Sequence, residues 1–137
     1  MIKRILIIGS ILILLLAASV YYYVFVYSVQ NHRDLNKELA IPISATDLSK
    51  EFITNEQAAN QKFLNKVIEV KGVVLSMDYD QTHQKTVLIG SEMELSNVFV
   101  TLKDSSKGFK IGDTILIKAI CSGFLSDVVL IDGVLQR

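Results

Sequence analysis

VIEVKGVVLSM, residues 67–77, is the stretch of this sequence that decides the fold. It is rich in valine, whose branched side chain suits the pleated surface of a β-strand. Gly72 stands in its middle, and a glycine inside a strand often marks a bulge or a sharp bend. The stretch therefore predicts one long strand that bends near Gly72.

Apolar segments separated by polar turns predict four more strands on the C-terminal side of this stretch. Five strands with a long, bent first strand are typical of a small closed barrel. Closure also removes the unpaired edges that an open five-stranded sheet exposes. The additional strands are predicted at residues 85–89, 98–102, 114–120 and 127–135, with connections at 78–84, 90–97, 105–113 and 122–126.

Short helices are expected on the N-terminal side of the first strand. Thr46 is a candidate N-cap for a helix over residues 47–53, with Asp47 placed favourably in its first turn. Asn55 is a second N-cap candidate, and an amphipathic stretch follows it over residues 56–64. We therefore expect a mainly β domain in which one or two short helices precede the barrel.

Residues 5–29 form an uncharged, apolar run near the N-terminus. About 20 helical residues span the hydrocarbon layer of a bilayer, so the run is long enough to cross with some tilt. The run predicts one transmembrane helix that anchors the chain in the lipid bilayer. Tyrosines at its far end suit the interface between lipid and water, and they are Tyr21, Tyr22, Tyr23 and Tyr27.

A cleaved signal peptide is the alternative for this segment. Lys3 and Arg4 form a basic start, and the small residues at 17–19 resemble a cleavage site. The apolar core of a signal peptide is about 7–15 residues long, however, and here the run continues to residue 29. We therefore expect an uncleaved anchor. The only cysteine, Cys121, lies far from this segment, which argues against lipoprotein processing there.

Basic residues on the two sides of the run set its expected orientation. Lys3 and Arg4 precede it, and Arg33 and Lys37 follow it. We expect the N-terminus in the cytoplasm and the domain outside; a domain that faces the cytoplasm is the alternative. The chain would then divide into a cytoplasmic N-terminus at 1–4, a transmembrane anchor at 5–29, a tether at 30–43 and a barrel domain at 44–137.

Two segments carry a resemblance to a known family. NEQAANQKFLNKVIEVKGVV at 55–74 and GDTILIKAICSGFLSDVVLIDGVL at 112–135 resemble, in their order and spacing, the tRNA-anticodon-binding-like OB-fold family of small bacterial envelope proteins of the Bacteroidetes type. The resemblance covers residues 44–136. It implies an OB barrel in a membrane-anchored or lipoprotein form, here at the bacterial inner (cytoplasmic) membrane, and the family has no assigned biochemical role. The positions that match are Asn55, Glu56, Ala59, Lys66, Val70, Gly72, Gly112, Asp113, Ile117, Lys118, Cys121, Gly123, Asp127, Val128, Val129 and Leu130.

An OB fold implies a ligand surface across its second and third strands and two adjoining loops. In this chain that surface combines the strands over 85–89 and 98–102 with the connections at 78–84 and 122–126. The candidate ligand residues are Tyr79, Asp80, His83, Thr86, Leu88, Phe99, Thr101 and Phe124.

Nucleic acid is not the expected ligand. The 14 Lys and Arg residues balance the 14 Asp and Glu residues, whereas a binder of single strands needs a positive groove with exposed aromatic side chains. The lysines, Lys118 included, are scattered among acids and suggest a solvated surface, while Asp78 and Asp80 would repel phosphate. A membrane-tethered OB domain that binds single-stranded nucleic acid stays the alternative.

No residue pattern points to catalysis or to a cofactor. Asp78, Asp80 and His83 are acceptable metal ligands, but their spacing matches no calcium loop and an ordinary turn is the simpler interpretation. Cys121 has no evident base nearby and is expected to be a small buried side chain. We therefore expect no enzyme, no metal and no cofactor, but a binding module whose partner is an envelope protein, peptide or glycan. No pattern predicts an oligomeric state.

Overall fold

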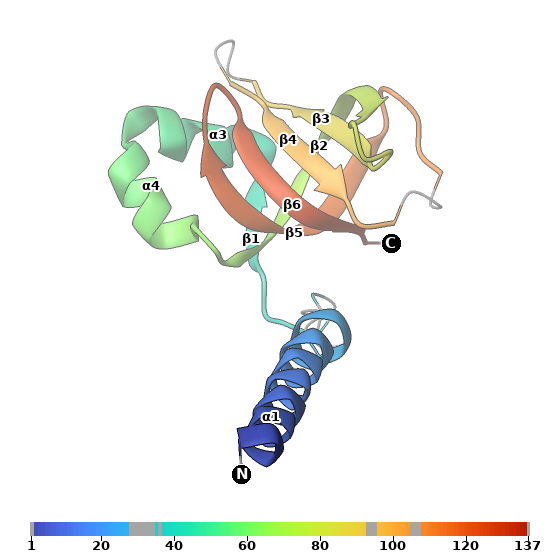
Figure 1. Ribbon diagram of the computed structural model, residues 1–137. Helices are drawn as coiled ribbons and strands as arrows, with labels where there is room; N and C mark the ends of the chain where they lie inside the picture. The colour runs from blue at the N-terminus through green and yellow to red at the C-terminus, as the bar shows by residue number, and fades with distance from the viewer. Residues whose placement is uncertain (1, 28–34, 36, 93–95, 105–107, 137) are drawn as a thin grey trace. The chain divides into compact units, whose positions relative to one another are not determined.

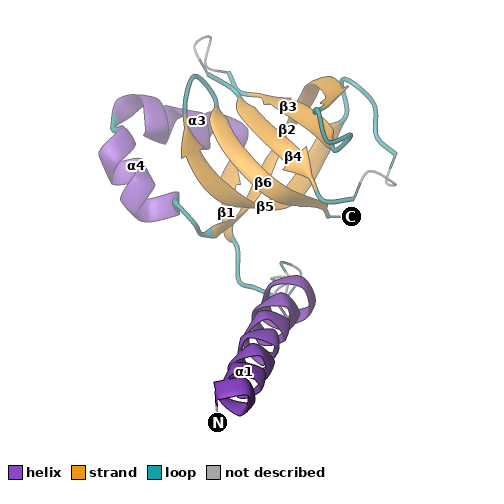
Figure 2. Cartoon of the chain, in the orientation of Figure 1, coloured by secondary structure: helices purple, strands orange, loops and turns teal. Residues whose placement is uncertain are grey.

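The computed structural model describes residues 2–27, 35, 37–92, 96–104 and 108–136. The chain divides into two compact units, Met1–Asp34 and Leu35–Arg137. The first unit is helical, and the second consists mainly of strands (Figures 1 and 2). The larger part of the expected tether, residues 28–34 and 36, lies outside the described residues.

The first unit is an apolar helix. α1 (Ile2–Tyr22) continues as one π-helical turn, η1 (Tyr23–Tyr27). Among the described residues, Ile7–Phe25 is the one helical segment long and apolar enough to cross a membrane, with a mean hydropathy of 2.2. The hydroxyls of Ser10 and Ser19 donate to backbone carbonyls three and four residues earlier, so neither needs water as a partner. The expected apolar helix is confirmed, and a helix near the N-terminus that passes this test can be a membrane anchor or a signal sequence.

The second unit is built on a closed barrel of five strands, drawn in orange in Figure 2. The strands are β2 (Val67–Tyr79), β3 (Lys85–Gly90), β4 (Val98–Leu102), β5 (Thr114–Phe124) and β6 (Val128–Leu135). Around the ring they follow the order β2, β3, β4, β6, β5, and the pairing of β5 with β2 closes it. β4 and β6 run parallel, and the other ring pairs are antiparallel. The predicted barrel is confirmed.

β2 is the bent strand that joins the two sides of the barrel. Its residues 67–73 pair with β5, and its residues 73–79 pair with β3, with a bulge between Val74 and Ser76. Gly72 lies where the pairing partner of β2 changes from β5 to β3. A Cβ atom there would lie 2.4 Å from Cγ2 of Ile89 and 3.0 Å from Cβ of Ala45, so the close packing requires a glycine.

β1 (Ile41–Ser44) is a sixth strand that the sequence analysis did not predict. It pairs in parallel with β2, from Ile41 opposite Ile68 to Ser44 opposite Lys71, so the end of the expected tether at 30–43 belongs to the sheet. The reason is its length: four residues that include Pro42 show no periodicity, and only the pairing with β2 makes them a strand.

Two helices follow β1, and their caps are local. α3 (Ala45–Thr54) begins after Ser44, whose hydroxyl oxygen accepts a hydrogen bond of 3.0 Å from the Asp47 amide. The prediction of Thr46 as the N-cap was therefore wrong, since its hydroxyl oxygen instead accepts from the Glu92 amide at 3.1 Å. α4 (Glu56–Phe63) begins after Asn55, whose side chain accepts from the Ala58 amide, and that predicted cap is confirmed.

α3 closes one end of the barrel. It contacts β1, β2, β3, β4 and β6, and it buries Leu48 and Phe52 completely or nearly so, at 0% and 1% exposure. α4 adds Ala59 and Phe63 to the same core. In Figure 1 both helices lie beside the strands of the second unit, near the turn that joins β5 to β6. The two helices therefore close this end of the barrel interior, and we call α3 and α4 the helical plug.

Candidate ligand-binding face

Four of the eight candidate residues come together on the outer surface of the barrel. Leu88 of β3 pairs with Phe99 of β4, and Thr86 pairs with Thr101. Successive side chains of a strand point to opposite faces, and the intervening residues Val87, Ile89, Val98 and Val100 are buried in the core. Leu88, Phe99 and Thr101 are partly exposed, whereas Thr86 is only 5% exposed.

The register extends this surface over four strands. Ser76 of β2 lies opposite Leu88, and Val129 of β6 lies opposite Phe99. We call the row Ser76, Leu88, Phe99 and Val129 the outer row. Sequence reasoning missed Val129, because the parallel pairing of β4 with β6 joins segments that are not adjacent in the sequence, and Ser76, because the bulge between Val74 and Ser76 shifts the register of β2. Alternation within each strand was the available signal, but it does not reveal the register between strands.

A hollow of about 230 Å³ lies at the β6 end of the outer row. It is lined by Ser122, Gly123, Phe124, Leu125 and Val129. Gly123 has a φ of +145°, a backbone conformation that glycine adopts without strain, and Leu125 is 84% exposed beside it. The face therefore ends in an apolar depression with an exposed leucine at its rim.

The face carries almost no charge. Beside the outer row, Asp78 lies opposite Thr86, which lies opposite Thr101, so these three residues form a second row. Across both rows Asp78 is the single ionisable side chain. The surface is thus a strip of alkyl, phenyl and hydroxyl groups without a cation.

Asp80 and His83 belong to the β2–β3 turn, not to this strip. One Asp80 carboxylate oxygen accepts hydrogen bonds from the Thr82 hydroxyl and from the amides of Thr82 and Gln84, at 2.7–2.9 Å. The Thr82 hydroxyl and then the Gln84 amide hold the pKa of Asp80 below its usual value. His83 is exposed with a φ of +61°. Both residues shape the turn.

Tyr79 and Phe124 are also placed apart from the two rows. Tyr79 pairs with Lys85, and alternation along β2 puts it on the opposite side of the pleat from Asp78, where it is 63% exposed. Phe124 lines the hollow, but its ring stacks on Phe52 of α3 with centroids 5.5 Å apart. Phe124 therefore joins the helix to the barrel as well as forming a wall.

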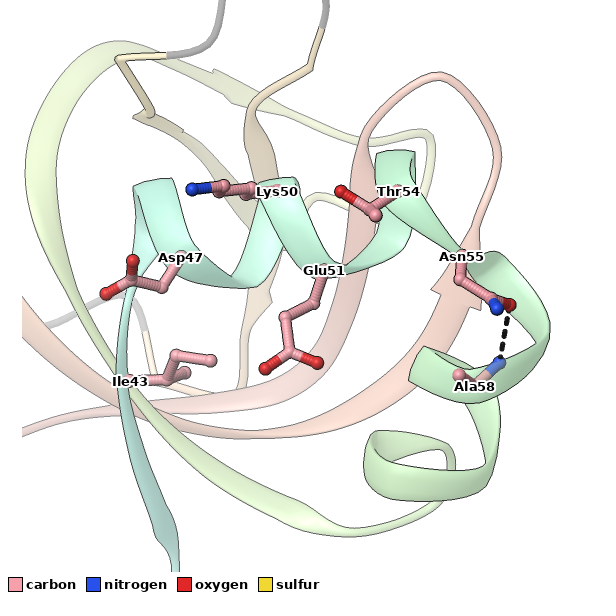
Figure 3. Close-up of a pocket in the computed structure, with 7 residues that line it drawn as sticks. All are labelled: Ile43, Asp47, Lys50, Glu51, Thr54, Asn55 and Ala58. Carbon is pink, nitrogen blue, oxygen red and sulfur yellow. Dashed lines mark hydrogen bonds between the residues drawn. The ribbon is translucent and has the colours of Figure 1, made fainter.

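A second hollow, of about 560 Å³, lies over α3, α4 and β1 (Figure 3). Three of its polar side chains are already engaged: Asp47 accepts from the Ser44 hydroxyl at 2.7 Å, Glu51 forms an ion pair with Lys62, and Asn55 caps α4. The dashed line in Figure 3 marks the bond from the Ala58 amide to Asn55. These groups stabilise the helices, so this hollow is the weaker candidate.

The described part of the chain contains no cluster of three His, Cys, Asp or Glu side chains that would hold a metal ion. Cys121 is fully buried in the core on β5, and burial raises the pKa of its thiol. A raised pKa keeps the thiol protonated and unreactive near neutral pH. The expectation that Cys121 is a small buried side chain is confirmed.

The barrel and its helices define an OB-fold protein. Its ring has a single parallel pair, between the third and fifth barrel strands. The tRNA_anti-like family matches residues 1–133, and this chain belongs to that family. The resemblance seen in the sequence is therefore confirmed.

A solved structure supports the same fold. The crystal structure of a proposed nucleic acid-binding lipoprotein from Klebsiella pneumoniae subsp. pneumoniae MGH 78578 is similar to this chain, with a TM-score of 0.59 and 14% sequence identity. The match covers 72% of this chain and 92% of that one. At this identity the likeness concerns the fold. No curated protein matches the sequence at a significant level.

Proposed function

We propose that this protein is a non-enzymatic binding module, held at the bacterial inner membrane by α1, whose barrel binds a protein or peptide segment of the cell envelope. The observation that carries the proposal is the outer row, Ser76, Leu88, Phe99 and Val129, with the hollow beside Leu125 at its end. An apolar strip bordered by a side-chain pocket suits an extended peptide that presents an apolar residue.

The chemistry of the strip favours a peptide over the other ligands that an OB fold can bind. Phosphate backbones need cations, and the two rows supply none. Sugars carry a hydroxyl on most carbons and need many polar partners. The two rows offer the hydroxyls of Ser76, Thr101 and the buried Thr86, together with the Asp78 carboxylate. Burial of Leu88 and Phe99 side chains would instead contribute about 25 cal/mol for each Å² of apolar surface removed from water.

The residues that have catalytic potential support the non-enzymatic part of the proposal. The Cys121 thiol is sealed in the core, and the Asp80 carboxylate is engaged by its own turn. His83 is exposed in that turn, on a segment that has no part in the two rows. A reaction would need a nucleophile and a base within hydrogen-bond reach of one another.

Site-specific photo-crosslinking in living cells tests the proposal. A photoreactive residue at Thr101 or at Val129, both on the face, is expected to trap the same envelope protein. The control position is Lys71, an exposed residue of β2 that pairs with β5 on another side of the barrel. The double variant Leu88→Ser/Phe99→Ser should abolish the adduct. Adducts of equal yield from Lys71, or adducts that survive the double variant, would reject the proposed face. A crosslink from the face to labelled glycan would support the glycan alternative.

A second candidate function is binding of single-stranded nucleic acid. It is favoured by the likeness to the proposed nucleic acid-binding lipoprotein, and by exposed Tyr79 and partly exposed Phe99, whose rings could stack on bases. Fluorescence anisotropy with a labelled oligonucleotide at low salt separates the two functions. We expect no binding; binding that weakens steeply as salt is added would establish the second function instead.

A further inference from the structure

A short segment that precedes β1 packs on the outside of the barrel, against the pair formed by β2 and β5. Leu35 is 2% exposed and clusters with Val67 of β2 and Ile120 of β5, which are 3% and 9% exposed. Their neighbours Ile68 and Ala119 belong to the core, so alternation puts Val67 and Ile120 on the outer surface. Outer residues of a small barrel normally face water, and here the segment removes them from it.

A lysine holds the same segment a few residues further on. Lys118 lies two residues before Ile120 on the outer side of β5 and is only 8% exposed, which corrects its interpretation as a solvated side chain. Its ammonium group donates to the backbone carbonyl of Glu38. A buried ammonium group is tolerated only when it has such partners. Ala40 then packs against the Leu35 cluster, directly before β1.

We propose that Leu35 and residues 37–40 form a strap that fixes where the chain from the N-terminal helix joins the barrel. In the ring order β2, β3, β4, β6, β5, the pair β2–β5 lies across from β4. The strap therefore joins the barrel on the side away from Phe99. If the strap is released, the chain from Leu35 to β1 would lengthen the connection by up to about 20 Å, at about 3.3–3.6 Å for each extended residue. The strap itself does not depend on the proposed ligand.

Trypsin digestion of the full chain in lipid nanodiscs tests the strap, because Lys37 lies inside it. A protease cleaves a docked segment only when that segment opens. In the unaltered protein we expect slow cleavage after Lys37, measured as the rate at which a fragment beginning at Glu38 appears by mass spectrometry. Lys118→Met removes the ammonium group, and Leu35→Asn removes the apolar contact. Each variant is expected to accelerate this cleavage about tenfold or more.

The chain offers a matched control for each variant. Leu39 lies in the same strap but is 99% exposed, so Leu39→Asn should leave the cleavage rate unchanged. Lys71 is exposed on β2, so Lys71→Met should also have no effect. Circular dichroism establishes that each variant keeps a folded barrel. If Leu35→Asn unfolds it, Lys118→Met with its own control still decides the question.

Two results would overturn the strap. One is cleavage after Lys37 in the unaltered protein that is as fast as in Lys118→Met. The other is an acceleration by Leu39→Asn equal to that by Leu35→Asn. The assay measures cleavage of one peptide bond in the anchored protein without any ligand. A negative crosslinking experiment therefore does not contradict the strap, and fast cleavage after Lys37 does not contradict the proposed ligand-binding face.

Discussion

The ring of Phe52 stacks on the ring of Phe124, with centroids 5.5 Å apart and planes inclined by 20°. Phe52 belongs to α3 and Phe124 ends β5, so the pair joins the helical plug to the barrel. Phe52 also lies 6.1 Å from the ring of Phe63 on α4, measured between centroids. Three rings from three elements therefore hold both helices on the barrel end, and Phe52 is the ring that they share.

Phe52→Ala should lower the free energy of unfolding by about 3–5 kcal/mol, because it leaves a cavity where a large buried ring was. Urea denaturation followed by circular dichroism measures the change. Ile53→Ala is the matched control: the neighbouring side chain is 37% exposed, and its loss should cost less than about 1 kcal/mol. A double-mutant cycle with Phe124→Ala should give a coupling of about 0.5–1.5 kcal/mol. Equal losses for the Phe52 and Ile53 variants would contradict the plug.

Gly72→Ala should lower the free energy of unfolding by about 1–3 kcal/mol through overpacking. The new Cβ would lie 2.4 Å from Cγ2 of Ile89, a side chain that is itself fully buried. Gly108→Ala provides the comparison, since a Cβ at Gly108 meets nothing within 4 Å. Thermal melts of both variants measure the difference in stability. A Gly72→Ala protein as stable as Gly108→Ala would show that β2 does not need glycine at its bend.

Cys121 should react slowly with thiol reagents in the folded protein. Burial both shields the thiol and raises its pKa, so the reactive thiolate is scarce near neutral pH. We expect the reaction with Ellman's reagent at pH 8 to be on the order of a hundredfold faster in guanidinium than in native buffer, since native reaction requires opening of the core. Comparable rates in both conditions would place the thiol at the surface.

Asp80 should titrate below its ordinary pKa of 3.8, as measured by NMR of its carboxyl carbon. A depressed pKa in the folded state means that the carboxylate stabilises the turn above the unfolded pKa, and that this contribution is lost as the pH falls through the folded pKa. Thr82→Val should raise the midpoint toward 3.8, because the Thr82 hydroxyl bond is the largest cause of the shift. Gln81→Ala, in the same turn, should leave it unchanged. A midpoint at or above 3.8 in the unaltered protein would contradict the turn geometry.

The mature protein from native cells should retain Ile7–Phe25 and require detergent for extraction. This helix is apolar along its length, and its exposure to water would be unfavourable. Mass spectrometry of the N-terminus and fractionation without detergent provide the measurements. A topology reporter fused after Arg137 should report a location outside the cytoplasm. A mature protein that begins near Val20 and fractionates without detergent would show that the segment is a cleaved signal peptide and not an anchor.

Local signals were sufficient for much of the fold. The valine-rich stretch around Gly72 predicted a bent strand, the polar turns delimited four more, and Asn55 was recognised as a helix cap from its own side chain and the residues after it. The apolar helix followed from composition alone. Each of these features depends on residues close together in the sequence, where periodicity and capping operate.

Contacts between distant segments decided the rest. β1 is a strand only because β2 lies beside it, and Ser76 and Val129 join Leu88 and Phe99 only through the register of four strands. The burial of Lys118 depends on a carbonyl 80 residues earlier in the chain. Apart from β1, the sequence by itself determined which segments would be helix or strand, since that choice is made within a few residues. The tertiary structure alone decided which side chains share a face, because register and burial are properties of pairs of segments.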